Sequence, residues 1–200
     1  MNTPPSILFG GGPPYVALFV SALVLWEGAE MVLNTKWRSG SSTSSQDRGS
    51  QRLLALLIGV AFALDFACAL LLPGAAIRPA RTVFTAGICC VMAGTALRLY
   101  AVATLGRYFT VDVATRAEQP VIDSGPYRCI RHPAYTGLLL ALLGFALAIG
   151  NWAGLLAMLV LPGVAFGYRI AVEEAAMLST LGETYARYMR RTWRLIPYLL

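Results

Sequence analysis

The residue types best suited to chemistry gather in one short stretch, between Gly125 and Gly137. His132, the only histidine of the chain, follows Arg131 and precedes Pro133, just before a hydrophobic segment. Proline suits the first position of a helix, because its φ is fixed and that position needs no N–H. We therefore predict a helix that begins at Pro133. Its free N–H groups would attract carboxylates or phosphates, and Arg131 and His132 would strengthen that field.

Two tyrosines, Tyr127 and Tyr135, flank the histidine. Aromatic faces attract cations. A ligand that combines an anion, a cation and an aromatic base, such as S-adenosylmethionine, would match these groups. The alternative is that Arg131 and His132 bind lipid head groups, while the tyrosines belong to the aromatic belt of a membrane protein. The residue types alone leave both interpretations open.

A second polar cluster contains Arg169, Glu173 and Glu174. Arg169 and Glu173 are four residues apart and would share one face of a helix. An exposed ion pair of this kind contributes less than about 1 kcal/mol. At the end of a hydrophobic segment, however, uncompensated charge is costly. The functional interpretation is that Arg169 fixes an acidic substrate and Glu173 holds a hydroxyl or amine of a cofactor.

Other ionisable residues fall within or near hydrophobic segments: Glu27, Glu30, Asp65 and Arg98. Charges inside a membrane are functional candidates by default. Glu27 and Glu30 are one helical turn apart and could meet Arg98 inside a bundle, so we favour mutual neutralisation over a proton path. The cysteines form no CxxC pair and no metal-like spacing with histidine, so we expect neither a disulfide framework nor a metal site.

Membrane-spanning helices must position these residues. The 200 residues are 57% hydrophobic and 13% charged, whereas soluble domains carry roughly 25% charged residues. A membrane span requires about 20 apolar residues. The candidate spans are 15–33, 53–72, 82–105, 135–149 and 152–170. We predict an all-α integral membrane protein with about five transmembrane helices in a single domain, residues 1–200, in which residues 1–105 hold the three N-terminal spans.

Gly150-Asn151 separates the last two spans so briefly that they must form an antiparallel helical hairpin. Beyond it, residues 173–193 keep helical spacing and a basic face, which predicts a cytoplasmic amphipathic helix. This helix is either an anchor for anionic lipids or a lid over a site. Residues 38–51, rich in serine and glycine, are predicted to be a flexible loop.

The basic residues concentrate on one side of the predicted spans. Residues 36–52, 107–131 and 169 onward contain most of them, whereas the opposite side has only Arg78 and Arg81. The positive-inside rule then predicts a cytoplasmic C-terminus and an external N-terminus. The net charge of +6 is explained by this topology, so nucleic acid is not an expected partner. Arginine, alanine and glycine are abundant, which points to a bacterial cytoplasmic membrane.

The chemistry-bearing residues also occur in a recognisable order. The motifs are Leu105-Gly106-Arg107-Tyr108-Phe109-Thr110, then Gly125-x-Tyr127-x-x-x-Arg131-His132-Pro133-x-Tyr135-x-Gly137, then Arg169-x-x-x-Glu173-Glu174 with Leu178, Gly182, Tyr185 and Tyr188, and finally Arg194-Leu195-Ile196-Pro197. This pattern resembles the isoprenylcysteine carboxyl methyltransferase family, which is similar to membrane phospholipid N-methyltransferases. The resemblance covers the segment from Leu105 to Pro197, and before it only the hydropathy matches.

The resemblance implies that residues 106–200 form the cofactor-binding methyltransferase half, with an S-adenosylmethionine site that faces the cytoplasm. Carried over by position, the residues that line the cofactor are Gln119, Pro120, Val121, Ile122, Tyr127, His132, Pro133, Ala134, Tyr135 and Glu173. Arg169 would lie near the acceptor carboxylate, Asp112 would add a polar contact, and a lipophilic substrate would enter from the bilayer. Cys129-Ile130 and Leu181 depart from the family pattern and bear on the acceptor rather than on the cofactor.

The reaction implied by this resemblance is direct displacement at the sulfonium methyl group. A carboxylate acceptor is anionic near pH 7, so catalysis would consist of positioning and desolvation. An amine or thiol acceptor, on a phospholipid or a small molecule, would need a base such as His132 or Glu174. The remaining alternatives are a non-catalytic membrane scaffold and a small transporter. Transport is disfavoured, because the charges lie at one face and no internal repeat is evident.

Overall fold

The computed structural model describes residues 7–36, 49–109 and 120–198, and within these ranges the regular structure is helical. The α-helices are α1 (Ile7–Gly10), α2 (Pro13–Lys36), α3 (Ser50–Leu71), α4 (Ala80–Leu105), α5 (Pro133–Ile149), α6 (Trp152–Leu181) and α7 (Glu183–Arg190), and the short 3-10 turns are η1 (Pro73–Ala75), η2 (Gly106–Tyr108) and η3 (Gly125–Arg128). In the described part, α2, α3, α4 and α6 are long and apolar enough to cross a membrane, and α5 is a shorter apolar helix of 17 residues. These helices confirm the predicted all-α membrane fold.

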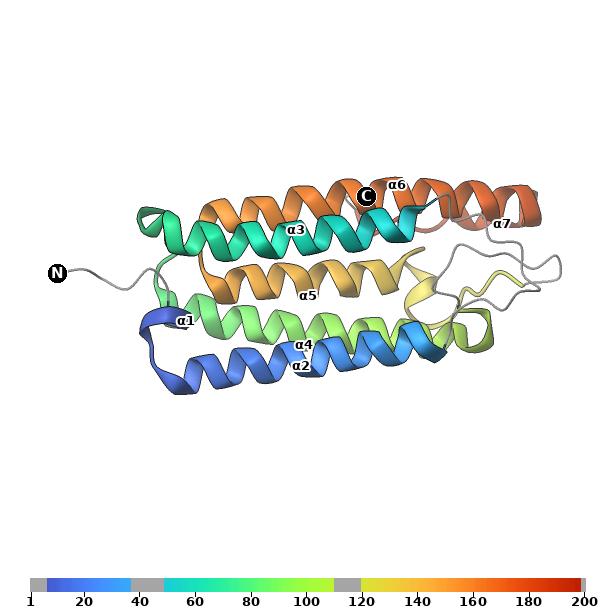
Figure 1. The fold of residues 1–200 in the computed structure, drawn as a ribbon. Coiled ribbons are helices and arrows are strands. Elements are labelled where there is room, and N and C mark those ends of the chain that lie inside the picture. Colours follow the sequence, from blue (N-terminus) through green and yellow to red (C-terminus); the bar gives the residue numbers. More distant parts are fainter. Residues whose placement is uncertain (1–6, 37–48, 110–119, 199–200) are drawn as a thin grey trace.

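Helix α5 lies at the centre of the bundle, between the pair α3 and α6 and the pair α2 and α4 (Figure 1). Its side chains are buried on nearly every side, including Ala141, Leu142 and Phe145. A helix that is apolar all round is expected in such a position. The predicted first residue of this helix, Pro133, is confirmed.

Glycines allow α4 and α5 to approach each other closely. A Cβ atom added to Gly94 of α4 or Gly144 of α5 would lie within 2.6 Å of backbone atoms of the opposite helix. Gly87 and Gly137 make the same kind of contact. Small residues at helix interfaces are typical of membrane proteins, where close packing replaces the hydrophobic effect as the force between helices. The result is a fixed register between α4 and the start of α5.

The predicted hairpin between α5 and α6 is confirmed at Gly150 and Asn151. Gly150 ends α5 in the left-handed conformation, with φ of 79°. Asn151 caps α6, since its side-chain oxygen accepts hydrogen bonds from the backbone N–H groups of Ala153 and Gly154. The Asn151 amide also donates to the carbonyls of Cys68 and Leu72. The turn is thereby tied to the end of α3.

The outer faces of the long helices are apolar. Val24 of α2, Leu71 of α3 and Leu156 of α6 are each at least 60% exposed. Large apolar side chains in continuous exposed bands are suited to contact with lipid. The chain is therefore an integral membrane protein.

Two predicted boundaries are wrong. The fifth span and the following amphipathic helix are not separate, because α6 continues to Leu181. No glycine or proline interrupts residues 168–181, whereas Gly182 has φ of 53° and separates α6 from α7. The predicted loop also ends earlier than Gln51, since α3 already begins at Ser50.

Candidate active site

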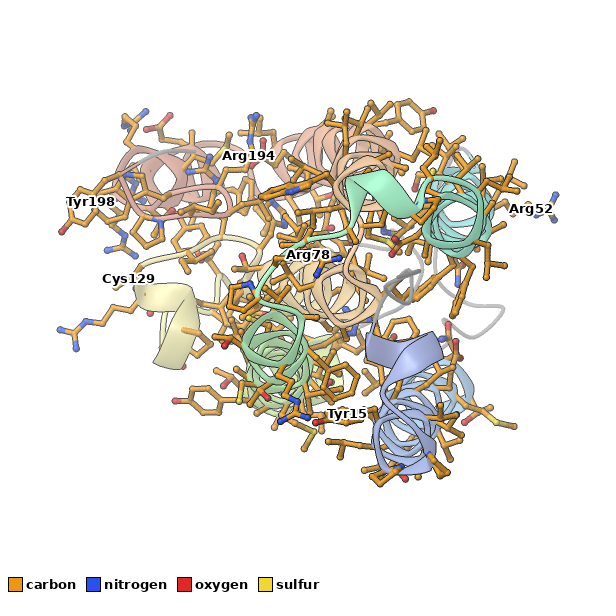
Figure 2. The ribbon with its side chains drawn as sticks, turned by 90° about the vertical axis from the view of Figure 1, so that its left-hand side faces the viewer. Tyr15, Arg52, Arg78, Cys129, Arg194 and Tyr198 are labelled. Carbon is orange, nitrogen blue, oxygen red and sulfur yellow. The ribbon has the colours of Figure 1, made fainter. Side chains whose placement is uncertain are left out.

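The start of α5 is held against the C-terminal segment by backbone hydrogen bonds. The N–H of Arg131 donates to the carbonyl of Trp193 at 2.7 Å, and the N–H of His132 donates to the carbonyl of Arg194 at 3.1 Å. The N–H of Trp193 donates in return to the carbonyl of Cys129. Viewed along the bundle, Cys129 lies on the same side as the C-terminal segment and opposite Arg52 (Figure 2). The helix start that was predicted to bind a ligand is thus fixed in place.

Three basic side chains, Arg131, His132 and Arg194, surround Glu174 of α6. We call these four residues the Glu174 cluster. Arg131 Nε donates to Glu174 Oε1 at 3.0 Å, and Arg194 Nη2 donates to Glu174 Oε2 at 2.7 Å. His132 Nε2 lies 3.2 Å from Glu174 Oε1. The Glu174 side chain is only 6% exposed, and this buried carboxylate is bonded by side chains from two parts of the chain, the start of α5 and the C-terminal segment.

Arg131 is hydrogen-bonded to several other parts of the protein. Besides Glu174, its guanidinium donates to the carbonyls of Met189 and Thr192, and its side chain is 10% exposed. Its Nε and Nη1 are therefore engaged within the protein. Arg131 joins the start of α5 to α6 and to the end of α7.

Glu173, the neighbour of Glu174, belongs to a different arrangement that we call the Tyr135 bridge: Arg169, Tyr135 and Glu173. The Tyr135 hydroxyl donates to Glu173 Oε2 at 2.7 Å and accepts from Arg169 Nε at 2.8 Å. Arg169 Nη1 also donates to Ser50 Oγ at 3.0 Å. Arg169 and Glu173 do share a helix face as predicted, and a phenol from α5 connects them.

His132 connects the two arrangements. Its Nε2 is directed at Glu174, while its Nδ1 lies 3.9 Å from Glu173 Oε2. Its ring stacks on that of Tyr135, with centroids 5.6 Å apart. Both ring nitrogens of His132 therefore face carboxylates, which accept hydrogen bonds.

Tyrosines of η3 and α7 lie beside the site, next to the segment that precedes α5. Burial raises the pKa of Tyr127, Tyr185 and Tyr188, and the charge of Glu173 adds to the effect at Tyr127 and Tyr185. These phenols therefore stay protonated at neutral pH and act as hydrogen-bond donors. The Tyr188 hydroxyl donates to the Tyr127 carbonyl at 2.8 Å, which fastens η3 to α7.

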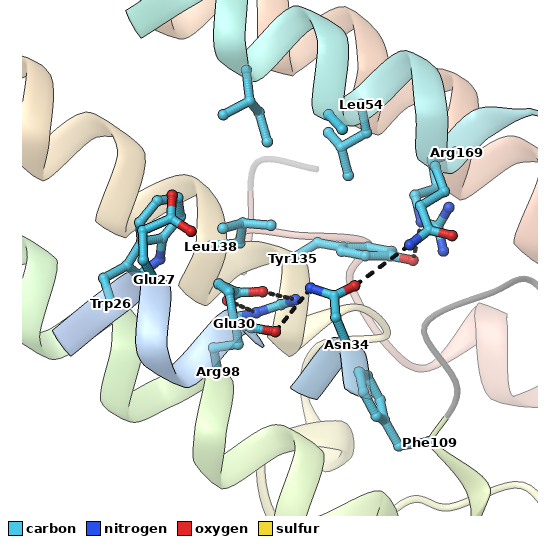
Figure 3. Close-up of a pocket in the computed structure, with 13 residues that line it drawn as sticks. Trp26, Glu27, Glu30, Asn34, Leu54, Arg98, Phe109, Tyr135, Leu138 and Arg169 are labelled. Atoms are coloured by element: carbon cyan, nitrogen blue, oxygen red, sulfur yellow. Dashed lines mark hydrogen bonds and ion pairs between the residues drawn. The ribbon is translucent and has the colours of Figure 1, made fainter. Parts of the chain in front are cut away.

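A cavity of about 160 Å³ lies beside the Tyr135 bridge, between α2 and α3 (Figure 3). Its polar lining includes Arg169, Tyr135 and Asn34, and its apolar lining includes Leu54 and Leu138. Helix α2 packs mainly on α4, and α3 packs mainly on α6, so the two helices leave this space between them. The cavity thus combines a basic group with walls that suit a lipid tail.

The predicted meeting of Glu30 and Arg98 is confirmed in the wall of this cavity. Arg98 binds both carboxylate oxygens of Glu30 and donates through Nη1 to the Ala134 carbonyl at 3.2 Å. Glu27 lines the cavity without a hydrogen bond or ion pair to the described residues. Asp65 is fully buried, has no hydrogen-bond partner in the described part of the chain, and packs against Gly154 near the opposite end of α6. Asp65 therefore does not belong to the site.

Most of the residues predicted to line the cofactor come together. His132, Pro133, Ala134, Tyr135, Tyr127 and Glu173 surround the start of α5, with Tyr127 packed near Ala134. Pro120, Val121 and Ile122 precede η3 in a non-helical segment and make no hydrogen bond to this group in the ranges that the structure describes. Gln119 and Asp112 lie outside the described residues.

The sequence analysis missed Ser50 and the amides of Asn34 and Gln51. Gln51 Nε2 approaches Asn34 Oδ1 at 3.5 Å across the cavity. Ser50 belongs to a serine-rich stretch in which no single serine stands out. The start of a helix immediately after Gly49 was the available signal, since glycine and serine commonly flank a helix N-terminus.

Comparison with known proteins gives a consistent result. The isoprenylcysteine carboxyl methyltransferase (ICMT) family matches residues 86–179. A probable protein-S-isoprenylcysteine O-methyltransferase of Oryza sativa subsp. indica is 27% identical over 184 residues, which are 91% of this chain and 95% of the relative. Protein-S-isoprenylcysteine O-methyltransferase B of Arabidopsis thaliana is 30% identical over 56% of this chain and 58% of its own length.

A solved structure also resembles the chain. It is described as the eukaryotic intramembrane Ras methyltransferase ICMT, and it matches with a TM-score of 0.65 and 21% identity. The match covers all of this chain and 70% of that protein. The two proteins therefore share a fold over the whole length of this chain, including the first half, where the sequence suggested only a similar hydropathy.

Proposed function

We propose that this chain is a member of the isoprenylcysteine carboxyl methyltransferase family, whose model matches residues 86–179, and that it is an S-adenosylmethionine-dependent membrane methyltransferase. Its acceptor is the carboxylate of an isoprenylcysteine-like or other lipophilic molecule. The observation that carries this proposal is the Tyr135 bridge, in which a guanidinium that lines a mostly apolar cavity is linked to a partly exposed carboxylate. An anionic acceptor and a cationic cofactor would then lie side by side.

The residues around the start of α5 fit the cofactor chemically. The Glu173 side chain is 33% exposed and offers a carboxylate to an amine or hydroxyl group. The rings of Tyr127 and Tyr135 are suited to a sulfonium. The N–H groups of Tyr135 and Thr136 donate to the His132 carbonyl, so the start of α5 would favour a carboxylate through the positive end of the helix dipole. When bound there, S-adenosylmethionine supplies an electrophilic methyl group that an anionic oxygen can take by direct displacement.

Arg169 would hold the acceptor carboxylate. It is 3% exposed as a residue, so its charge is little screened by water and interacts strongly with an anion. Guanidinium groups match carboxylates through two parallel hydrogen bonds. The apolar walls at Leu54, Ile58 and Leu138 would take the lipid tail, which supports entry from the bilayer.

A carboxylate acceptor fits this site better than an amine or a thiol. An amine or thiol acceptor would have to lose a proton, and the sequence offers His132 or Glu174 as the base. Glu174 already accepts hydrogen bonds from Arg131 and Arg194, and His132 faces two carboxylates. Both groups are therefore already engaged by charged side chains of the protein, whereas a carboxylate acceptor needs no base.

The site is proposed to face the cytoplasm. Arginines concentrate at this end of the bundle, with Arg128 in η3, Arg187 and Arg190 in α7, and Arg191 directly after α7. The opposite end of the bundle carries Arg78 and Arg81. The positive-inside rule supports a cytoplasmic C-terminus in a bacterial cytoplasmic membrane, with the N-terminus outside.

The test is methyl transfer by the purified protein in lipid, with methyl-labelled S-adenosylmethionine. A prenylcysteine analogue and a total lipid extract are offered separately, and the products are treated with alkali. Label released as methanol identifies a methyl ester and supports the proposal. Alkali-stable label would instead identify an amine or thiol acceptor. Failure to bind the cofactor at all would overturn the assignment of the site.

A further inference from the structure

Ser50, in the first turn of α3, is hydrogen-bonded to Arg169 of the site but does not line the cavity. Its side chain is fully buried, and its Oγ accepts a hydrogen bond from Arg169 Nη1 at 3.0 Å. Gly49 precedes it with φ of 75°, and the helix then begins at Ser50 itself. The start of α3 therefore places one hydroxyl directly against the guanidinium of α6.

Arg169 is held from two directions. Tyr135, from α5, accepts from Nε at 2.8 Å, and Ser50, from α3, accepts from Nη1. The guanidinium is planar, so two fixed hydrogen bonds at different nitrogens define the orientation of the whole group. The bond from Nη1 to Ser50 therefore adds to the bond at Nε in fixing the plane of the group. Orientation matters because a guanidinium recognises a carboxylate through a fork with fixed geometry.

The two partners belong to different sides of the site. Tyr135 also bonds Glu173 and lies among the residues assigned to the cofactor. Ser50 belongs to a helix that contributes to the cavity, where Gln51 and Leu54 line the wall, and it bonds Arg169 rather than Glu173. A change at Ser50 therefore acts on the acceptor side of the site.

We infer that Ser50 is a positioning residue that orients Arg169 for a carboxylate, and so determines the preference for an acidic acceptor over a neutral one. This inference rests on the proposed function. It assigns a role to the first half of the chain, in which the motifs of the family do not occur. Because Ser50 acts through Arg169, its removal would change acceptor selectivity while cofactor affinity stays the same.

The experiment compares two ligands that differ only in charge, a prenylcysteine analogue with a free carboxylate and the same analogue with a carboxamide. Dissociation constants for both, and for S-adenosylmethionine, are measured on the full chain in lipid for the wild type and Ser50→Ala. Loss of one hydrogen bond to a charged group changes a binding constant by about tenfold. We expect Ser50→Ala to lower the carboxylate-to-carboxamide preference by about that factor.

The controls separate positioning from general damage. Ser50→Thr keeps the hydroxyl and should keep the preference, while Ser50→Gly lacks it and should reproduce the alanine result. Ser179→Ala removes an exposed α6 hydroxyl that bonds only the carbonyl of Ala176 among the described residues. This variant should leave both the carboxylate-to-carboxamide preference and the cofactor affinity unchanged. Thermal unfolding midpoints show whether each variant is folded.

Two results would overturn the inference. One is an unchanged preference in both Ser50→Ala and Ser50→Gly, and the other is a loss of cofactor affinity as large as the loss of acceptor affinity. Failure of the proposed function is a distinct result. In that case the wild type itself transfers no methyl group and does not prefer the carboxylate ligand.

Discussion

Glu173 and Glu174 are neighbours on α6, yet their surroundings have little in common. Glu173 is 33% exposed and accepts from the Tyr135 hydroxyl, whereas Glu174 is 6% exposed and is bonded by Arg131, His132 and Arg194. Consecutive residues of a helix point about 100° apart, so α6 directs one carboxylate toward the proposed ligand site and the other toward the C-terminal segment. Glu173 therefore remains available to a ligand, whereas Glu174 stabilises the fold.

This difference follows from the cost of burying charge. A carboxylate removed from water must be neutralised and hydrogen-bonded, and three partners do this for Glu174. Glu173 keeps contact with the outside and needs fewer partners. We therefore expect changes in the Tyr135 bridge to affect function, and changes in the Glu174 cluster to affect stability.

The largest expected effect is that of Arg169→Ala on turnover. Removing a positioned charged group costs about 100-fold to 1,000-fold in rate, and we expect the upper part of this range, because Arg169 is the basic group of the Tyr135 bridge. Methyl transfer to a prenylcysteine analogue measures the loss. Cofactor affinity, measured by direct binding, should stay within about twofold of the wild type, and an equal loss of binding and turnover would contradict this division.

Glu174→Ala should have the largest effect on stability. It leaves Arg131 buried without its carboxylate, and breaking a buried ion pair costs about 3 to 5 kcal/mol. For a chain of this size, 1 kcal/mol lowers the midpoint by roughly 2 to 4 °C, so a fall of about 10 °C is expected. Thermal unfolding in detergent or lipid measures it. A midpoint close to that of the wild type would refute the structural role of the Glu174 cluster.

Glu173→Gln tests the other member of the comparison. Glutamine can still accept from the Tyr135 hydroxyl, so the fold should be kept and the midpoint should change little. The charge that would attract a cationic cofactor is lost, and cofactor affinity should fall by about tenfold or more. Titration with S-adenosylmethionine measures it. Unchanged affinity together with lost stability would mean that the roles of the two glutamates are reversed.

The fold was largely predictable because its signals are local. Apolar segments of the right length predicted the spans, Pro133 predicted the start of α5, and Gly150-Asn151 predicted the hairpin. The wrong boundary after Ile170 came from composition, because charged residues enter the sequence there while the backbone continues as helix to Leu181. A change in polarity marks where a helix leaves the membrane and does not mark where it ends.

The site was predictable only in part. The spacing of Arg169 and Glu173 placed both on one helix face, and the hydrogen bonds to Tyr135 agree with that. The partners of Glu174, and the bond between Ser50 and Arg169, join segments far apart in the sequence. Such contacts depend on how distant segments pack, as α3 and α6 do where Gly154 lies closely against Asp65, and no local pattern encodes them.

The smallest expected effect is that of Arg194→Ala on stability, which is compared with that of Arg131→Ala within the Glu174 cluster. Arg131 and Arg194 both bind Glu174, but the Arg194 side chain is 48% exposed and that of Arg131 is 10% exposed. Exposed ion pairs contribute about 1 kcal/mol or less, so Arg194→Ala should lower the thermal midpoint by only a few degrees. Arg131→Ala also removes the bonds to the carbonyls of Met189 and Thr192, and its effect on the thermal midpoint should be several times larger.

Salt distinguishes the two variants, because screening weakens exposed ion pairs far more than buried ones. The loss in Arg194→Ala should shrink in high salt while that in Arg131→Ala persists, and equal salt sensitivity would mean that both arginines meet Glu174 in contact with water.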